Sequence, residues 1–335
     1  MYQDSIIGIT TADSSPLYAV YQWGLKVIQA IQTMETPVCT AALQMLTQGG
    51  TPYFYIPVIL FVLWCVDEKQ GLRLGILMLL SAWVNGTCKS LLKQPRPYTL
   101  DPSVGRGFEL SYGIPSGHAQ MALTFWIPLA LRIRKIPVWI GAILITLLIG
   151  FTRLYLGLHF PTDVLAGWLL GGIILGIYYG TQGVLEKALD AGGTRFRMIS
   201  IALIALGMNA AGSDPSLSGL FLGFGTGYAL MRSRFPFSAQ APIRGKQPDS
   251  LVLGARYALG IAGAGLVYQG LGAVLSLRVF PYELSRFLHY GAVGFWACAG
   301  APWLFLRLGL GAGTGRTGDK HAGEAGETQD GGWRG

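Results

Sequence analysis

Three short segments of this apolar chain combine the residue types that handle phosphate. Cations, histidines, a hydroxyl, a glycine and a carboxylate occur in them at Lys89, Arg96, Ser116, Gly117, His118, Arg153, His159 and Asp163. Lysine and arginine bind phosphate, and arginine does so through paired N–H groups. Two histidines can supply a nucleophile and a general acid. No cluster of carboxylates or cysteines suggests a metal or another cofactor. The set predicts metal-independent phosphoryl transfer through a phosphohistidine.

Each segment alone also has an ordinary structural explanation. Lys89 and its neighbours suit cations that extend from a helix end to the membrane interface. His118 could be a histidine at the membrane interface beside a capped helix start. Asp163 could be the N-cap of a helix, with no functional link to His159. The joint occurrence favours function, because ionisable groups at membrane depth are costly.

The second segment has the features of an anion site. Pro115 and Ser116 suit the start of a helix, where the first N–H groups have no partner within the helix. The helix dipole favours negative charge there, and Gly117 lets an anion approach the backbone. In the third segment, Asp163 follows His159 by four residues, so one helical turn brings its carboxylate to the imidazole.

Taken in order, the segments resemble the signature of the type 2 phosphatidic acid phosphatase superfamily. That signature is Lys-x6-Arg-Pro, then Pro-Ser-Gly-His, then Ser-Arg-x5-His-x3-Asp. Its elements match Lys89 to Pro97, Pro115 to His118, and Arg153 to Asp163. Thr152 replaces the usual serine and keeps the hydroxyl. The resemblance covers roughly Leu72 to Gly180.

The resemblance implies a role for each residue. His159 would attack phosphorus, Asp163 would orient His159, and His118 would protonate the leaving group. The phosphate oxygens would be held by Lys89, Arg96, Ser116, Gly117 and Arg153.

The composition predicts an all-α polytopic membrane protein. Of its 335 residues, 51% are hydrophobic and 13% are charged, and the mean hydropathy is +0.45. Soluble domains carry about 25% charged residues. We expect about nine transmembrane helices around a helical-bundle phosphatase core: Thr51–Val66, Leu72–Leu92, Ser116–Arg134, Pro137–Arg153, Asp163–Gly180, Met198–Ala211, Ser216–Met231, Tyr257–Leu277 and Phe287–Leu306. The pair from Met198 to Met231 is either two short spans or a re-entrant hairpin.

The positions of the basic residues predict an orientation. The turns after the first, third, fifth and seventh spans carry groups of lysine and arginine, whereas the short opposite turn around Asp214 has none. The positive-inside rule places these turns in the cytoplasm, with the N-terminus outside and the C-terminus inside. The loops Lys93–Pro115 and Leu154–Thr162 then share the outer, periplasmic face of a plasma membrane. The net charge of +8 reflects this topology, so we expect no nucleic-acid partner.

The chain divides into four parts by pattern. Residues 1–50 form an amphipathic segment, residues 51–180 the catalytic core of five spans, residues 181–310 accessory transmembrane helices, and residues 311–335 a disordered tail. In the first part, Leu17, Tyr21, Leu25 and Ile28 share one helical face. This helix either lies in the membrane interface or packs against the bundle, and Pro37 would end it.

A lipid phosphate or diphosphate monoester is the expected substrate, because its tails can stay among membrane lipids while its headgroup reaches the site. Tyr98, Tyr112 and Trp168 either line that boundary or act as interfacial anchors. A phosphotransferase using the same site is an alternative. A transporter is a weaker one, because the ionisable residues gather at one face. We expect His289 to be a packing or interfacial residue and His321 to belong to the tail.

Overall fold

The computed structural model describes residues 16–212, 214–275 and 280–313, which are helical apart from connecting turns and two very short strands. The α-helices are α2 (Pro16–Gln32), α3 (Pro37–Gln48), α4 (Pro52–Phe61), α5 (Glu68–Leu92), α6 (Pro97–Leu100), α7 (Gly117–Ile133), α8 (Ile136–Tyr155), α9 (Pro161–Ala191), α10 (Gly193–Ala210), α11 (Pro215–Arg234), α12 (Ser250–Leu275), α13 (Tyr282–Phe295) and α14 (Ala301–Arg307). Two π-helical segments (Val62–Val66 and Trp296–Gly300) and a 3₁₀ turn (Pro102–Val104) extend them, and β1 (Phe237–Ser238) pairs with β2 (Ala312–Gly313).

Local sequence explains where many helices begin and end. Proline occupies the first turn of α3, α4, α8, α9 and α11, where its missing N–H costs nothing. The side chain of Asp67 caps α5 by accepting from the N–H groups of Lys69 and Gln70. Helix α2 already ends at Gln32, and Pro37, expected to end that helix, instead opens α3.

Within the described residues, all nine expected segments are largely helical, but nine membrane spans are not confirmed. Among the described residues, four helical stretches are long and apolar enough to cross a membrane: Glu68–Leu100, Ile136–Tyr155, Pro161–Ala191 and Ser250–Leu275. The pair Pro37–Gln48 and Pro52–Val66 makes a fifth if it counts as one span, bent by 44° at its break. Several expected spans are too short or too polar, which limits the number to four or five.

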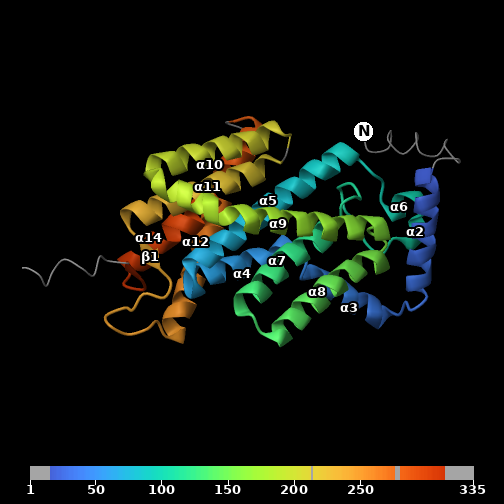
Figure 1. Ribbon diagram of the computed structural model, residues 1–335, viewed down its shortest axis with the longest axis horizontal. Coiled ribbons are helices and arrows are strands. Elements are labelled where there is room, and N and C mark those ends of the chain that lie inside the picture. Colours follow the sequence, from blue (N-terminus) through green and yellow to red (C-terminus); the bar gives the residue numbers. More distant parts are fainter. Residues whose placement is uncertain (1–15, 213, 276–279, 314–335) are drawn as a thin grey trace, which may run out of the picture.

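The helices form two groups, with α5 and α9 running between them (Figure 1). Helices α2, α3, α7 and α8 lie in one half, and α10 to α14 lie in the other. Helix α11 packs extensively against α13. Their backbones approach closely, because a Cβ added at Gly223 would lie only 1.8 Å from the carbonyl oxygen of Gly291.

Helix α2 packs against the bundle, which decides between the two expectations for this segment. Tyr21, Leu25 and Ile28 are buried against Val104 and Phe160. The Tyr21 ring stacks on Phe160 with centroids 5.0 Å apart. The apolar face of α2 thus covers the turns on either side of the predicted site.

Some of the basic turns and the catalytic loops lie at different ends of the bundle. At one end, Arg73 pairs with Glu186 at 2.6 Å, and Arg232 pairs with Asp190 at 2.7 Å. At the other end, the loops 93–115 and 154–162 meet, and the Arg106 N–H donates to the Leu156 carbonyl at 2.9 Å. The orientation of these ends relative to a membrane stays a prediction.

Only the beginning of the expected disordered tail is described. Ala312 and Gly313 pair antiparallel with Phe237 and Ser238, at the end of the bundle that carries the basic turns. The rest of the tail, with His321, and residues 1–15 of the N-terminal segment lie outside the described residues.

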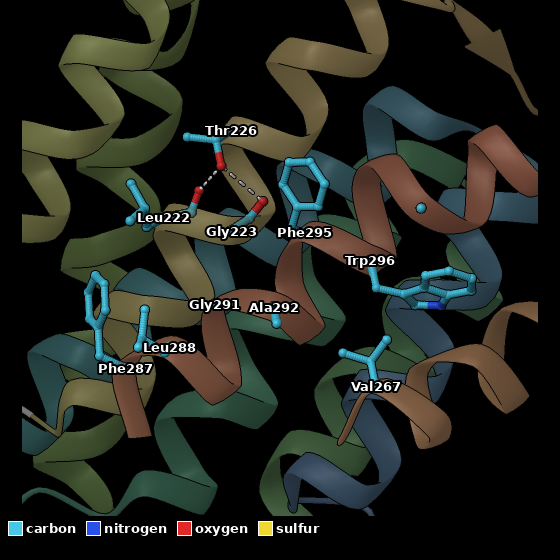
Figure 2. Close-up of a pocket in the computed structure, with 11 residues that line it drawn as sticks. Leu222, Gly223, Thr226, Val267, Phe287, Leu288, Gly291, Ala292, Phe295 and Trp296 are labelled. Atoms are coloured by element: carbon cyan, nitrogen blue, oxygen red, sulfur yellow. Dashed lines mark hydrogen bonds between the residues drawn. The ribbon is translucent and has the colours of Figure 1, made fainter. Parts of the chain in front are cut away.

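An apolar cavity of about 470 Å³ lies among the C-terminal helices (Figure 2). Its lining comes from α11, α12, α13 and the following π-helical segment, and includes Phe287, Leu288 and Trp296. None of its lining side chains is titratable. The cavity therefore offers no residue for phosphoryl transfer.

The packing of α2 generates a stability prediction. We expect Ile28→Ala to lower the Tm of the protein in detergent, because truncating a fully buried isoleucine costs about 2–5 kcal/mol. Leu17→Ala on the same helix is the matched control, since Leu17 is 48% exposed. Equal Tm values for the two variants would contradict the observed packing.

Candidate active site

His159 lies in the tight turn between α8 and α9. The N–H groups of Leu158 and His159 both donate to the Arg153 carbonyl, at 3.1 and 3.2 Å. Gly157 permits this turn with a φ of +65°, and a Cβ there would lie 2.0 Å from the Val104 carbonyl oxygen. The turn buries the imidazole, whose side chain is 1% exposed.

The neighbours of His159 define its tautomer. Arg96 Nη1 lies 3.2 Å from Nε2 of the ring, and Asp163 Oδ2 lies 3.3 Å from Nδ1. Arginine can only donate, so Nε2 is the acceptor and Nδ1 carries the proton toward Asp163. Burial, with Arg96 and Lys89 nearby, holds the pKa of His159 well below its usual range. The imidazole is therefore neutral, with its Nε2 lone pair facing the cations.

Asp163 is a positioning carboxylate within the first turn of α9. Phe160 is the N-cap of that helix, so Asp163 is not the cap itself. Its Oδ2 accepts from the Phe160 N–H at 2.9 Å as well as facing the histidine. The helix start therefore fixes the carboxylate relative to the imidazole.

Arg96 donates four hydrogen bonds and forms one ion pair. Nε donates to the Ser111 carbonyl at 2.6 Å, and Nη1 donates to the Leu158 carbonyl at 2.8 Å and to His159. Nη2 donates to Ser111 Oγ at 2.8 Å and lies 2.7 Å from Glu109 Oε2 in an ion pair. The guanidinium is fully buried, which is tolerable because these acceptors and the Glu109 carboxylate replace water around it.

The other two cations reach the same place from different helices. Arg153, at the end of α8, donates to Glu109 Oε1 and, at 2.9 Å, to Thr47 Oγ1. Its Nε is buried without a partner among the described residues. Lys89, in the last turn of α5, donates to the carbonyls of Tyr112 and Gly113.

The start of α7 joins this group through its backbone. The Ser116 N–H donates to the Asp163 carbonyl at 2.9 Å. Ser116 stands at the N-cap, but its side chain makes no capping bond, unlike the usual cap serine. Within the described part of the chain, its buried Oγ has no partner. This hydroxyl is therefore available to a ligand beside the free N–H groups of the helix start.

A buried polar network between α5 and α7 supports the start of α7 from inside the bundle. Asn85 Nδ2 donates to the Pro115 carbonyl at 3.3 Å and to Gln120 Oε1 at 2.8 Å. Gln120 Nε2 in turn donates to the carbonyl and hydroxyl of Ser81. A satisfied network of this kind fixes the position of α7 relative to α5.

His118, in the first turn of α7, packs against the break between α3 and α4. A Cβ added at Gly50 would lie 2.7 Å from the His118 ring. Because Thr47 holds Arg153 at the same break, residues 47–50 contact two of the expected site residues. All eight expected residues thus lie at one end of the bundle, joined by direct contacts or through adjacent residues.

Sequence reasoning missed three participants. Glu109 and Ser111 lie in the loop before α7 and bind the arginines, and Thr47 lies far upstream. None has a spacing pattern that would have revealed it. Tyr98 was expected at the membrane boundary, but its hydroxyl faces Glu109, donating to its carbonyl at 2.7 Å and accepting from its N–H at 3.3 Å.

Glu109 is a charged carboxylate in the site. Burial by itself raises the pKa of Glu109, but Arg153 and Arg96 outweigh this effect and hold that pKa below its ordinary value. The site therefore contains a resident anion between the two guanidinium groups.

Comparison with known proteins identifies the family. Residues 70–185 match the model of the PAP2 superfamily, and residues 215–314 match that of the PAP2 superfamily phosphatase transmembrane extension. The phosphatidylglycerophosphatase B of Bacillus subtilis is 31% identical over 155 residues, which is 42% of this chain and 73% of that protein. The chain belongs to the PAP2 superfamily of membrane lipid phosphatases.

Two further relatives align with this chain over a larger share of their own length. The undecaprenyl-diphosphatase of Sulfolobus acidocaldarius is 29% identical over 175 residues, covering 49% of this chain and 82% of that protein. The sphingosine-1-phosphate phosphatase 2 of Mus musculus is 27% identical over 308 residues, covering 78% of this chain and 85% of that protein. The protein is accordingly a phosphatase of the PAP2 type.

The contact between Thr47 and Arg153 generates a kinetic prediction. Thr47→Val removes the acceptor of a charge-assisted hydrogen bond, so we expect kcat/KM for a lipid phosphate to fall about tenfold. Thr51→Val is the matched control, because the Thr51 hydroxyl only donates to the Gln48 carbonyl beside the same break. Unchanged kinetics for Thr47→Val would contradict a positioning role.

The environment of His159 generates a pH prediction. Because its pKa is lowered, the imidazole takes a proton only below the ordinary value of 6.5 and remains a free nucleophile above it. The decrease of kcat/KM at acidic pH that is caused by protonation of the enzyme should therefore occur below pH 6.5. The measurement is a pH profile corrected for the separately titrated substrate, and such a decrease above pH 6.5 would refute the assignment.

Proposed function

We propose that this protein hydrolyses lipid phosphate or diphosphate monoesters by way of a phosphohistidine, without a metal ion. The observation that carries the proposal is the His159 imidazole, held between Asp163 and Arg96 with its Nε2 lone pair directed at the cations. A buried neutral nucleophile among guanidinium groups suits attack on an anionic phosphorus centre.

In the first chemical step, Nε2 of His159 attacks the terminal phosphorus and the bond from phosphorus to the leaving oxygen breaks. That oxygen belongs to the lipid alcohol in a monophosphate and to the lipid phosphate in a diphosphate. His118 gives its proton to that leaving oxygen. In the second step, water attacks the phosphohistidine and His118 takes a proton from it. The nitrogen–phosphorus bond then breaks, which releases phosphate and restores His159. Asp163 stabilises the positive charge that develops on the ring.

The charge on the transferring group is neutralised by side chains and backbone. Lys89, Arg96 and Arg153 bind the equatorial oxygens, together with the Ser116 hydroxyl and the Gly117 N–H. Phosphoryl transfer depends mainly on such positioning and charge neutralisation. Ser116 Oγ and Arg153 Nε support this assignment. Both atoms are buried without a hydrogen-bond partner among the described residues, and each could donate a hydrogen bond to a phosphate oxygen.

A lipid substrate is supported by the surface around the site. Phe108 and Leu110 stand on either side of Glu109 and are 70% and 87% exposed. Large apolar side chains in water are costly, whereas acyl or isoprenyl chains would cover them. The named relatives act on an isoprenyl diphosphate, a sphingoid phosphate and a glycerophosphatide, which all combine a phosphate with a long apolar chain.

We place the site on the outer side of a plasma membrane, with the C-terminus inside. The argument is the positive-inside rule, because the basic turns gather at the opposite end of the bundle. The described C-terminal residues, Ala312 and Gly313, lie near Glu68 at that same end, since Glu68 accepts from Ser238 and Ala239 beside them.

The test is phosphate release in detergent from a panel of lipid phosphates and diphosphates, with EDTA present. We expect release by the wild type and a loss of at least about a thousandfold in His159→Ala, because removing a nucleophile abolishes the covalent route. His289→Ala is the control, since His289 stacks on Tyr268 outside the site, with ring centroids 4.5 Å apart.

Three outcomes would count against the proposal. Equal release by wild type and His159→Ala would remove His159 as the nucleophile. Release that stops in EDTA would contradict the metal-independent mechanism. Transfer of labelled phosphate to an acceptor lipid instead of water would replace the hydrolase with a phosphotransferase.

A further inference from the structure

The segment Glu109–Gly113 lies across all three cations of the site. Glu109 binds Arg96 and Arg153 through separate carboxylate oxygens. Ser111 binds Arg96 through its carbonyl and hydroxyl, and the carbonyls of Tyr112 and Gly113 accept from Lys89. One short stretch of loop therefore supplies oxygen ligands to all three cations that would hold a substrate phosphate.

Among these ligands, only the Glu109 carboxylate is an anion that presents two oxygen atoms as a phosphate group does. A carboxylate presents two oxygens, as phosphate does, and arginine pairs with either in the same geometry. The Glu109 oxygens bridge two guanidinium groups, as two phosphate oxygens would. The arrangement thus reproduces, with a protein side chain, the contact expected of the substrate.

Arg96 already has close contacts where a phosphate would bind. Four hydrogen bonds leave this guanidinium, one of them to His159 Nε2, and Nη2 also forms an ion pair with Glu109 Oε2 at 2.7 Å. A phosphate oxygen that pairs with Nη2 would compete with Glu109 for the same charge. His159 gives up its bond when it attacks phosphorus, and Glu109 is the remaining acceptor that carries charge.

We propose that Glu109 is an internal substitute for phosphate, which occupies the arginine subsite between turnovers and exchanges with substrate and product phosphate. This inference rests on the proposed function, and it assigns to Glu109 the setting of phosphate affinity. While it is bound, the carboxylate compensates two buried cations that would otherwise be unpaired. When it returns, it competes with the product and favours phosphate release.

The exchange requires only a side-chain movement. Tyr98 holds the backbone of Glu109 on both sides, through its carbonyl and its N–H. The Glu109 side chain is 29% exposed, so the carboxylate has a route to water. The loop can keep its path while the carboxylate rotates out and the phosphate enters.

The experiment compares phosphate binding by wild type, Glu109→Gln and a control, each as the full chain in detergent. Inorganic phosphate is the probe, titrated by calorimetry and, in parallel, as an inhibitor of lipid phosphate hydrolysis. We expect Glu109→Gln to bind phosphate about tenfold more tightly than wild type, because the amide is a neutral and weaker competitor. Glu109→Ala should shift binding in the same direction and serves as a second variant if the glutamine variant is unstable.

Glu35→Gln is the matched control. Glu35 forms a two-oxygen ion pair with Arg106 in the same loop, at 2.6 and 2.7 Å, but contacts none of the site cations. Its removal makes the same change in charge near the loop. We therefore expect its phosphate affinity to equal that of wild type.

The outcomes separate this inference from the proposed function. Equal or weaker phosphate binding by both Glu109 variants, with hydrolysis by wild type intact, overturns the inference and makes Glu109 a fixed support for the arginines. A similar tightening in Glu35→Gln also overturns it, because a general charge effect would then explain the result. Wild type that neither hydrolyses lipid phosphates nor binds phosphate overturns the proposed function instead.

Discussion

Three cations must stay charged, buried and ready for phosphate at one end of an apolar helical bundle. Removing a charge from water costs several kcal/mol unless ligands replace the water. Lys89 meets this requirement with two loop carbonyls, and Arg96 meets it with four hydrogen-bond acceptors and an ion pair with Glu109. The path of the loop before α7 therefore places its oxygen atoms where these buried cations can donate hydrogen bonds to them.

The same constraint explains why segments far apart in the chain converge. Helix α2 buries Tyr21 and Ile28 against the turns that carry the site, and the break after α3 supplies Thr47 to Arg153. Asn85 and Gln120 fix the start of α7 from inside the bundle. Each contact positions a charged group or a helix start, so we propose that the N-terminal segment supports the catalytic core.

The C-terminal helices act at a distance from this chemistry. Apolar residues of α5, among them Trp83, pack on Met208 of α10 and Phe221 of α11. Helix α5 also carries Lys89 in its last turn. Residues 215–314, which match the transmembrane extension of the family, thus support the helix that brings the first cation to the site.

The sequence by itself determined the chemistry and its placement along the chain. The types and spacing of Lys89, His118, His159 and Asp163 indicated phosphoryl transfer, because helical periodicity and helix ends are local properties. The charge of the loops indicated which segments lie at the same end of the bundle. The ion pair of Arg73 with Glu186 brings two of these segments together.

Tertiary structure decided what local pattern cannot encode. It packed α2 on the bundle, left Ser116 Oγ without a capping bond, limited the long apolar stretches to four or five, and placed Glu109 between two arginines. These results depend on contacts between residues distant in sequence. A single carboxylate in a long loop has no periodicity, so only the folded chain reveals which cations it meets.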